Sequence, residues 1–137
     1  MLVLDAAAVE TLLPMRACID VMERALAALA RKESASPLRT VIRMPKGAIA
    51  AMPAYDGASA TTGAKIVTVF PGNAAIGLPS HLGVVLIFDA ADGVLRAMLD
   101  ASAITAIRTA AVAALATRVL SREDAKILAI VGTGVQA

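Results

Sequence analysis

The chain has very few aromatic residues: one Tyr, two Phe and no Trp among 137 residues. Its hydrophobic core must therefore be built from Ala, Val, Leu, Ile and Met. Residues of the hydrophobic classes make up 58% of the sequence. This amount of apolar surface available for burial excludes a disordered chain, and the length alone favours one domain.

Cysteine and histidine each occur once. Cys18 cannot form an internal disulfide, and a single free cysteine fits a reducing compartment. Its apolar neighbours in a helical pattern indicate a small buried hydrophobe. His81 has no Cys or second His at ligand spacing, which argues against a metal site. A Gly-x-Ser-x-Gly elbow is also missing, so a Ser-His-Asp hydrolase has no support.

Clustered positive charge and long apolar runs are missing as well. The net charge is +2, and the Lys and Arg residues are spread along the chain, so a nucleic-acid partner has little support. No signal peptide is evident, because Met1-Leu-Val-Leu meets Asp5 without a basic segment. The apolar stretch Gly83–Phe88 has the length of a buried strand and not the roughly 20 residues of a bilayer span. We therefore expect a cytoplasmic protein without a membrane partner.

The apolar residues recur first at helical spacing and then at strand spacing. The pattern predicts helices from the Asp5 cap through Leu13, from Pro14 and Met15 to about Lys32, and from Ala101 to about Leu120 with Asp100 or Ser102 as cap. It predicts strands at Arg39–Met44, Ala48–Pro53, Ala64–Phe70, Leu82–Phe88, Val94–Leu99 and Lys126–Val131. Turns are indicated at Pro45-Lys-Gly47 and at Gly93, and a loop at Pro71–Pro79. The mixture predicts an α/β fold.

A glycine pattern, Gly132-Thr-Gly-Val-Gln-Ala137, follows the last predicted strand. It matches the G-x-G-x-x-G/A fingerprint of dinucleotide-binding proteins. In that motif the first glycine makes a tight turn, and the second lets pyrophosphate approach the backbone. The next helix holds the phosphates at its N-terminus. An ordinary glycine turn after a strand stays open as the alternative.

Some cationic side chains lie in apolar surroundings. Lys65 belongs to a predicted strand with two apolar faces, so its ammonium either reaches solvent from the strand end or meets a buried anion. Arg108 has no carboxylate three or four residues away on its helix, which favours a planar anion as partner. The alternative is a surface arginine whose stem covers apolar groups. For Arg39 and Arg43, on one face of a short strand, a solvated edge is the favoured interpretation.

Together, Gly63-Ala-Lys-Ile-Val-Thr-Val-Phe-Pro-Gly-Asn73, Ile104-Thr-Ala-Ile-Arg-Thr-Ala-Ala111 and the terminal glycine pattern resemble the ornithine cyclodeaminase/mu-crystallin family. The resemblance covers essentially the whole chain but less than half of a typical member. It implies that residues 1–120 form a substrate-binding and dimerisation domain, with a mixed sheet flanked by helices. Residues 121–137 would be the first strand and turn of a Rossmann domain.

The resemblance also implies roles for individual residues. Arg39, Lys65 and Arg108 would bind the carboxylate of a small amino or imino acid. Ser80 and Arg108 would lie near the nicotinamide of NAD or NADP. The pyrophosphate turn would consist of Gly132, Gly134, Val135 and Gln136. A homodimer is expected.

The implied activity is that of an ornithine cyclodeaminase, which converts an amino acid such as ornithine to proline and ammonia. The alternatives are an NAD(P)H-dependent reductase of cyclic imino acids, an alanine dehydrogenase, and a non-catalytic dimerising or ligand-binding fragment. No carboxylate in the chain, Asp89, Asp92 and Asp100 included, matches the family's catalytic aspartate. We therefore expect no catalytic residue within the chain, no turnover by the chain alone, and poor dinucleotide binding.

Overall fold

A mixed β-sheet with helices on one face forms the fold in the computed structural model, which describes residues 1–132 and 134–135. The strand order is β1-β7-β6-β5-β4-β2, and β3 also pairs with β4. Only β1 and β7 run parallel among these pairs. The strands are β1 Leu2–Leu4, β2 Ser34–Ala35, β3 Thr40–Met44, β4 Gly47–Asp56, β5 Thr61–Val69, β6 His81–Asp89 and β7 Leu95–Asp100. The predicted mixed sheet of an α/β fold is confirmed.

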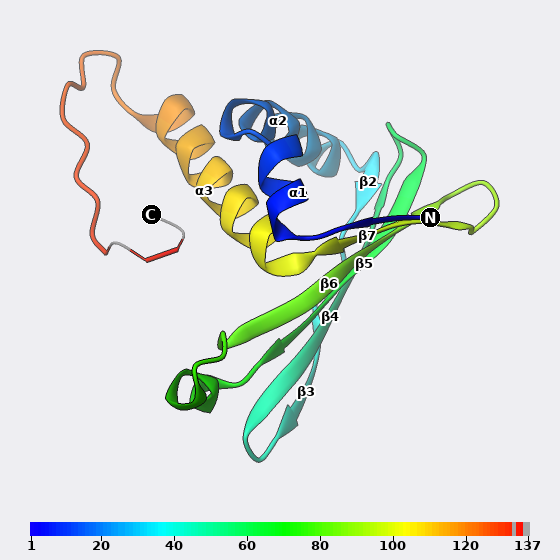
Figure 1. Ribbon diagram of the computed structural model, residues 1–137. Helices are drawn as coiled ribbons and strands as arrows, with labels where there is room; N and C mark the ends of the chain where they lie inside the picture. The colour runs from blue at the N-terminus through cyan, green and yellow to red at the C-terminus, as the bar shows by residue number, and fades with distance from the viewer. Residues whose placement is uncertain (133, 136–137) are drawn as a thin grey trace.

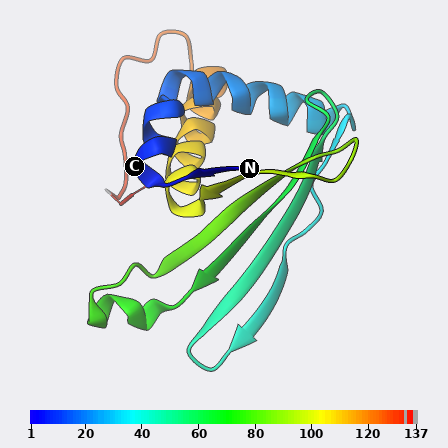
Figure 2. The ribbon, with the colours of Figure 1, turned by 45° about the vertical axis from the view of Figure 1, so that its right-hand side comes forward.

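The helices are α1 Ala6–Leu12, α2 Met15–Ala30 and α3 Ala101–Leu120, with a 3-10 helix, η1, at Pro71–Ile76. All three α-helices lie over one end of the sheet, on the same face (Figures 1 and 2). The strand ends that carry η1 and the β3–β4 turn extend past them (Figure 2). No described helix covers the other face of the sheet.

Local side-chain chemistry explains where the helices start. The Asp5 carboxylate accepts a hydrogen bond from the backbone N–H of Ala8 at 2.9 Å, and Asp100 accepts one from Ala103 at 2.7 Å. Both predicted caps, with Asp100 chosen over Ser102, are therefore confirmed. Pro14 is the N-cap of α2 rather than a residue of its first turn.

The core is built where small residues let the helices approach. Ala101, Ala103, Ala111 and Leu115 are the buried residues of α3, which packs on α1, α2 and β6. Cys18 of α2 is buried as expected, and burial raises the pKa of its thiol. An alanine-rich surface permits close contact at little side-chain entropy cost.

The strand predicted at Lys126–Val131 is wrong: these residues form neither helix nor strand. Their side chains are exposed, with Ile127 at 91% and Val131 at 101% of full accessibility. A strand exists only when a neighbouring strand satisfies its backbone N–H and C=O groups, and no described strand pairs with this segment. The apolar composition indicates that this segment can form a strand, but it does not say whether another strand lies alongside to pair with it.

The longest apolar helix also bears on the expectation of no membrane partner, which the sequence drew from runs of strand length. By length and composition alone, α3 is apolar enough to cross a membrane. A core helix of a folded domain passes the same test. The helix α3 packs against the sheet and both other helices, and 17% of its most apolar window is buried. Two strands, β1 and β2, were not predicted, because segments of three and two residues carry no readable period.

Candidate functional site

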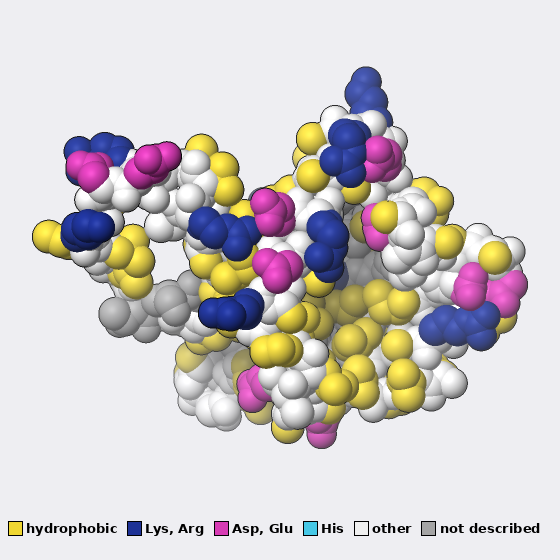
Figure 3. Space-filling model, turned by 90° about the horizontal axis from the view of Figure 1, so that it is seen from above, with side chains coloured by type: hydrophobic (Ala, Val, Ile, Leu, Met, Phe, Trp, Pro, Cys, Tyr) yellow, Lys and Arg dark blue, Asp and Glu magenta, His cyan; other side chains and the backbone are white. Residues whose placement is uncertain are grey.

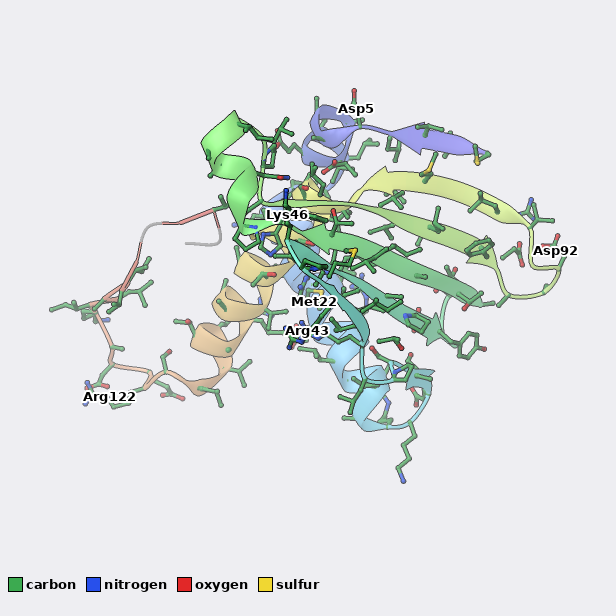
Figure 4. The ribbon with its side chains drawn as sticks, turned by 90° about the horizontal axis from the view of Figure 1, so that it is seen from below. Asp5, Met22, Arg43, Lys46, Asp92 and Arg122 are labelled. Atoms are coloured by element: carbon green, nitrogen blue, oxygen red, sulfur yellow. The ribbon has the colours of Figure 1, made fainter. Side chains whose placement is uncertain are left out.

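A cavity of about 660 Å³ lies between α2, α3 and the sheet. Its walls are mainly apolar and include Met22, Leu26, Leu29, Met52 and Ile104. Figure 3, seen from above the helices, shows a hollow in the surface whose visible walls are largely hydrophobic. Met22 of α2 lies near the middle of the molecule in Figure 4, whereas Asp92 and Arg122 lie at its opposite sides.

Three cationic side chains from separate parts of the chain line this one cavity: Arg39, Lys65 and Arg108. Arg39 precedes β3, Lys65 lies within β5, and Arg108 lies on α3. Lys65 and Arg108 are half-buried, and Arg39 is exposed. The structure thus brings together the residues that the family resemblance implied for carboxylate binding.

None of these cations forms an ion pair with a described carboxylate. The ion pairs of residues 1–132 and 134–135 instead involve Arg31, Arg96, Arg118 and Arg122. The Lys65 ammonium donates a hydrogen bond to the Thr105 hydroxyl, with an Nζ–Oγ1 distance of 3.2 Å. A cavity with apolar walls and unpaired positive charge is suited to an anionic ligand.

The pKa of Lys65 responds to this environment. Burial lowers the pKa below its ordinary value, and the positive charges of Arg108 and then Arg39 lower it further. Desolvation and like charges both disfavour the ammonium form. An anion placed among these groups would reverse the repulsion and stabilise all of the cations.

Asp56 is the one carboxylate among the described residues that line the cavity. Its oxygens accept hydrogen bonds from the hydroxyls of Ser34 and Ser59, at 2.8 and 2.6 Å. Bonds from Ser59 and then Ser34 hold the pKa of Asp56 below its ordinary value. Asp56 pairs with Thr61 in the β4–β5 register and Met52 pairs with Lys65, so the carboxylate lies four positions along the strand from the ammonium.

Ser80 is not brought to the cavity. It directly precedes β6, and its hydroxyl lies 3.2 Å from Nδ1 of His81. In the β5–β6 register His81 pairs with Val69, four positions from the pair of Lys65 with Val85. Ser102, near the start of α3, donates to the His81 carbonyl at 3.2 Å. Ser80 thus lies near the N-terminus of α3, apart from the cationic cluster.

The glycine pattern does not form a phosphate-binding turn in the described residues. Gly132 has φ of 97°, in the left-handed region that glycine tolerates, but residues 121–135 form no helix or strand where described. Val135 is 87% exposed, and Gln136 lies outside the described residues. A dinucleotide cradle needs a strand and a helix N-terminus on either side of the turn. The described residues alone therefore do not fit a dinucleotide.

Two polar residues of the site were not singled out in the sequence. Thr105 lies three residues before Arg108, and this helical spacing placed both on one face. Asp56 carried no such signal, because its place in the cavity depends on the pairing of β4 with β5.

Comparison with known proteins agrees with the family resemblance found in the sequence. The model of the ornithine cyclodeaminase/mu-crystallin family matches residues 1–137. The ketimine reductase mu-crystallin of Mus musculus is 44% identical over 103 residues, which are 74% of this chain and 33% of that protein. The Delta(1)-pyrroline-2-carboxylate/Delta(1)-piperideine-2-carboxylate reductase of Azospirillum brasilense is 39% identical over 136 residues, 98% of this chain and 43% of that protein.

Solved structures share the fold. The Thermococcus litoralis Delta(1)-pyrroline-2-carboxylate reductase, in complex with NADH and L-proline, has a TM-score of 0.92 and 38% identity, over 99% of this chain and 43% of that chain. An archaeal alanine dehydrogenase dimer with bound NAD has a TM-score of 0.94 and 29% identity, over 99% and 42%. A lysine cyclodeaminase has a TM-score of 0.82 and 34% identity, over 99% and 43%. The chain spans less than half the length of these proteins.

Proposed function

Because this chain belongs to the ornithine cyclodeaminase/mu-crystallin family, we propose that it is the substrate-binding part of an NAD(P)-dependent enzyme acting on a small amino or imino acid. The observation that carries the proposal is the convergence of Arg39, Lys65 and Arg108 on one cavity without a described carboxylate partner. A substrate carboxylate supplies the missing anion. Two guanidinium groups and an ammonium can hold both of its oxygens in a fixed orientation.

We further propose a cyclic imino acid as the substrate and its reduction as the reaction. A diamino acid would bring a second ammonium group into a cavity that already holds the cations Arg39, Lys65 and Arg108. The available carboxylate, Asp56, is four strand positions from Lys65 and already accepts bonds from Ser34 and Ser59. Apolar walls suit a ring of carbon atoms. We therefore rank imino-acid reduction above the cyclodeaminase reaction, whereas the sequence expectation put the cyclodeaminase reaction first.

In this proposal the residues of the chain bind and orient the substrate. Arg39, Lys65 and Arg108 fix the carboxylate, and apolar side chains such as Met22 and Leu26 limit the access of water to the ring. The redox chemistry belongs to the dinucleotide. Ser80 and the glycines of residues 132–134 stay proposed contacts on the cofactor side, as do Val135 and Gln136. We also propose a domain boundary at residue 120, a proposal supported by the end of α3 at Leu120.

A diamino-acid cyclodeaminase is the second candidate, and Asp56 is the observation that favours it. Its carboxylate lines the same cavity as Lys65 and has a lowered pKa, so it stays ionised at neutral pH. It could accept a distal ammonium group if Ser34 or Ser59 yielded a hydrogen bond. The similarity to a lysine cyclodeaminase supports the same candidate.

We also propose a homodimer that covers the helix-free face of the sheet. β3 is exposed along its whole length, and its apolar side chains on the helix-free face include Ile42 at 63% and Met44 at 38%. Solvent-exposed apolar strands favour association with another copy. A cytoplasmic location stays a prediction.

The test uses the protein isolated from its native source, after its intact mass has been recorded. Oxidation of NADH and NADPH is followed with Delta(1)-pyrroline-2-carboxylate and Delta(1)-piperideine-2-carboxylate. Release of ammonia is followed with ornithine and lysine in the presence of NAD⁺ or NADP⁺, because a cyclodeaminase returns the hydride and leaves no net reduction of the dinucleotide. We expect turnover of the cyclic imino acids, abolished by Lys65→Met. Turnover of ornithine alone, lost in Asp56→Asn, would favour the cyclodeaminase. No turnover of either class would contradict the proposed enzyme.

A further inference from the structure

A hydrogen bond joins the central strand of the site to its helix. Lys65 on β5 donates from Nζ to Oγ1 of Thr105 on α3, at 3.2 Å and in a partly buried position. Thr105 lies one turn before Arg108 on α3, so the two side chains share a helix face. The hydroxyl therefore lies beside the two half-buried cations of the cavity.

The Thr105 hydroxyl is used differently from those of two other helical threonines, Thr11 and Thr117. Thr11 and Thr117 each donate to the carbonyl four residues earlier, at 2.9 Å in both cases. That local bond is the usual one for threonine within a helix. The described hydrogen bond of Thr105 is instead the one it accepts from Lys65, across the space between helix and strand.

Lys65 needs such an acceptor because its charged neighbours repel it. Arg108 and Arg39 lie close enough to disfavour the ammonium form, and no described carboxylate pairs with Lys65. A lysine stem is flexible, so an unheld ammonium would turn away from the guanidinium groups. A neutral hydroxyl attracts the ammonium without neutralising it. An ammonium has three N–H donors, so the others remain free for a ligand.

We propose that Thr105 is a positioning residue that holds the Lys65 ammonium beside Arg108, ready to bind the substrate carboxylate. The inference rests on the proposed carboxylate-binding function. Thr105 acts through Lys65 and not by contact with the substrate.

The first experiment measures binding of L-proline, and of planar pyrrole-2-carboxylate, to this chain by NMR titration. Thr105→Val keeps the shape of the side chain and removes the acceptor. We expect binding about tenfold weaker, the usual effect of losing one hydrogen bond to a charged group. Thr105→Ser should restore it. Thr117→Val is the matched control, since its hydroxyl bonds to Ala113 of its own helix.

A double-mutant cycle shows whether Thr105 acts through Lys65. In a Lys65→Met background, Thr105→Val should cause no further loss of binding. An equal loss in both backgrounds would show that Thr105 acts independently and would overturn the proposal. So would wild-type affinity in Thr105→Val.

A ligand-free measurement separates this proposal from the proposed function. The titratable groups that share the cavity with Lys65 are Arg39, Arg108, Asp56 and Tyr55, and all are unchanged in Thr105→Val. Loss of the acceptor should lower the pKa of Lys65 further, as followed by NMR of its ε-methylene group, while Thr105→Ser and Thr117→Val leave it unchanged. If no carboxylate binds the wild type but this shift is seen, the function fails and the positioning of Lys65 stands. If carboxylates bind and no shift is seen, the positioning fails and the function stands.

Discussion

Arg108 is the residue whose chemistry is hardest to replace at this site. It is half-buried in the cavity, and no described side chain forms an ion pair with it. A guanidinium group presents N–H donors in a planar fork that matches a carboxylate, and an ammonium does not. Arginine and lysine should therefore not be interchangeable at this position.

We predict that Arg108→Lys weakens binding of L-proline about tenfold, and that Arg108→Met weakens it more. Isothermal titration calorimetry of the chain measures both. Arg118→Lys is the control, because Arg118 pairs with Glu23 at 2.7 Å outside the cavity lining. Equal affinity of Arg108→Lys and wild type would contradict a bidentate role for Arg108.

The pH dependence of binding should follow Lys65. The ammonium is the form that binds a carboxylate, and burial, Arg108 and Arg39 lower its pKa below the ordinary value of 10.5. Affinity for L-proline should thus be constant at pH values below this lowered pKa and fall as the pH rises through it. Lys65→Met should remove this step from the binding curve. A step that persists in Lys65→Met would assign the titration to another group.

The lowered pKa of Lys65 also makes folding stability depend on pH. The direction is opposite to that for a lysine whose pKa is raised by a salt bridge. Because the folded-state pKa is lowered, the unfolded chain holds this proton more tightly. Stability relative to Lys65→Met should therefore rise with pH between the lowered pKa and the ordinary lysine value. Urea unfolding at a series of pH values measures the difference.

At the scale of elements, α3 connects the core to the site. Its buried alanines pack on neighbouring elements, and the same helix carries Arg108 to the cavity and Thr105 to within 3.2 Å of the Lys65 ammonium. Asp100 ends β7 and caps α3, so the helix starts at a fixed point of the sheet. The position of Arg108 therefore depends on how closely α3 can approach the sheet.

We predict that Ala111→Leu lowers the free energy of unfolding by about 1–3 kcal/mol, because Ala111 is fully buried and a larger side chain overpacks the contact. Ala114→Leu, the same change at an exposed position of α3, should have little effect. Chemical denaturation of both variants gives the comparison. Equal stability of the two would mean that the close approach of α3 is not required.

At the scale of the whole molecule, two stretches of exposed apolar surface among the described residues bear on association. One is the helix-free face of the sheet, with β3 at its edge, and the other is the segment 126–131. Exposed apolar surface of this kind favours association or low solubility. The isolated chain should therefore not behave as a well-dispersed monomer.

We predict that sedimentation velocity finds a dimer and that Ile42→Glu shifts it toward monomer, because a charge on β3 opposes burial of that strand. Lys46→Glu, at the β3–β4 turn, is the control for the change of charge. A monomeric wild-type chain at high concentration would contradict the proposed dimer.

Cofactor binding by the chain alone is a separate prediction at this scale. The described residues 121–135 form no strand or helix around the glycine turn, so phosphate groups have no fixed donors to bind. A fluorescence titration with NADH should show no saturation at micromolar concentrations. Saturable micromolar binding would show that the turn is formed without those elements.

The sequence by itself determined the local structure. Capping by Asp5 and Asp100 and the turns at Pro45-Lys46 and Gly93 depend on neighbours a few residues apart, so the pattern predicted them correctly. The family motifs also identified Arg39, Lys65 and Arg108 as candidates. Their types and spacing can be read without knowing any contact.

Only the tertiary structure decided which distant residues meet. Lys65 and Thr105 are 40 positions apart, and their hydrogen bond exists because α3 packs over β5. The pairing of β1 with β7 and the absence of a strand at 126–131 likewise depend on which backbone lies alongside. Strand pairing and the convergence of charges are interactions between remote segments, and a local pattern of residue types carries no information about the partner.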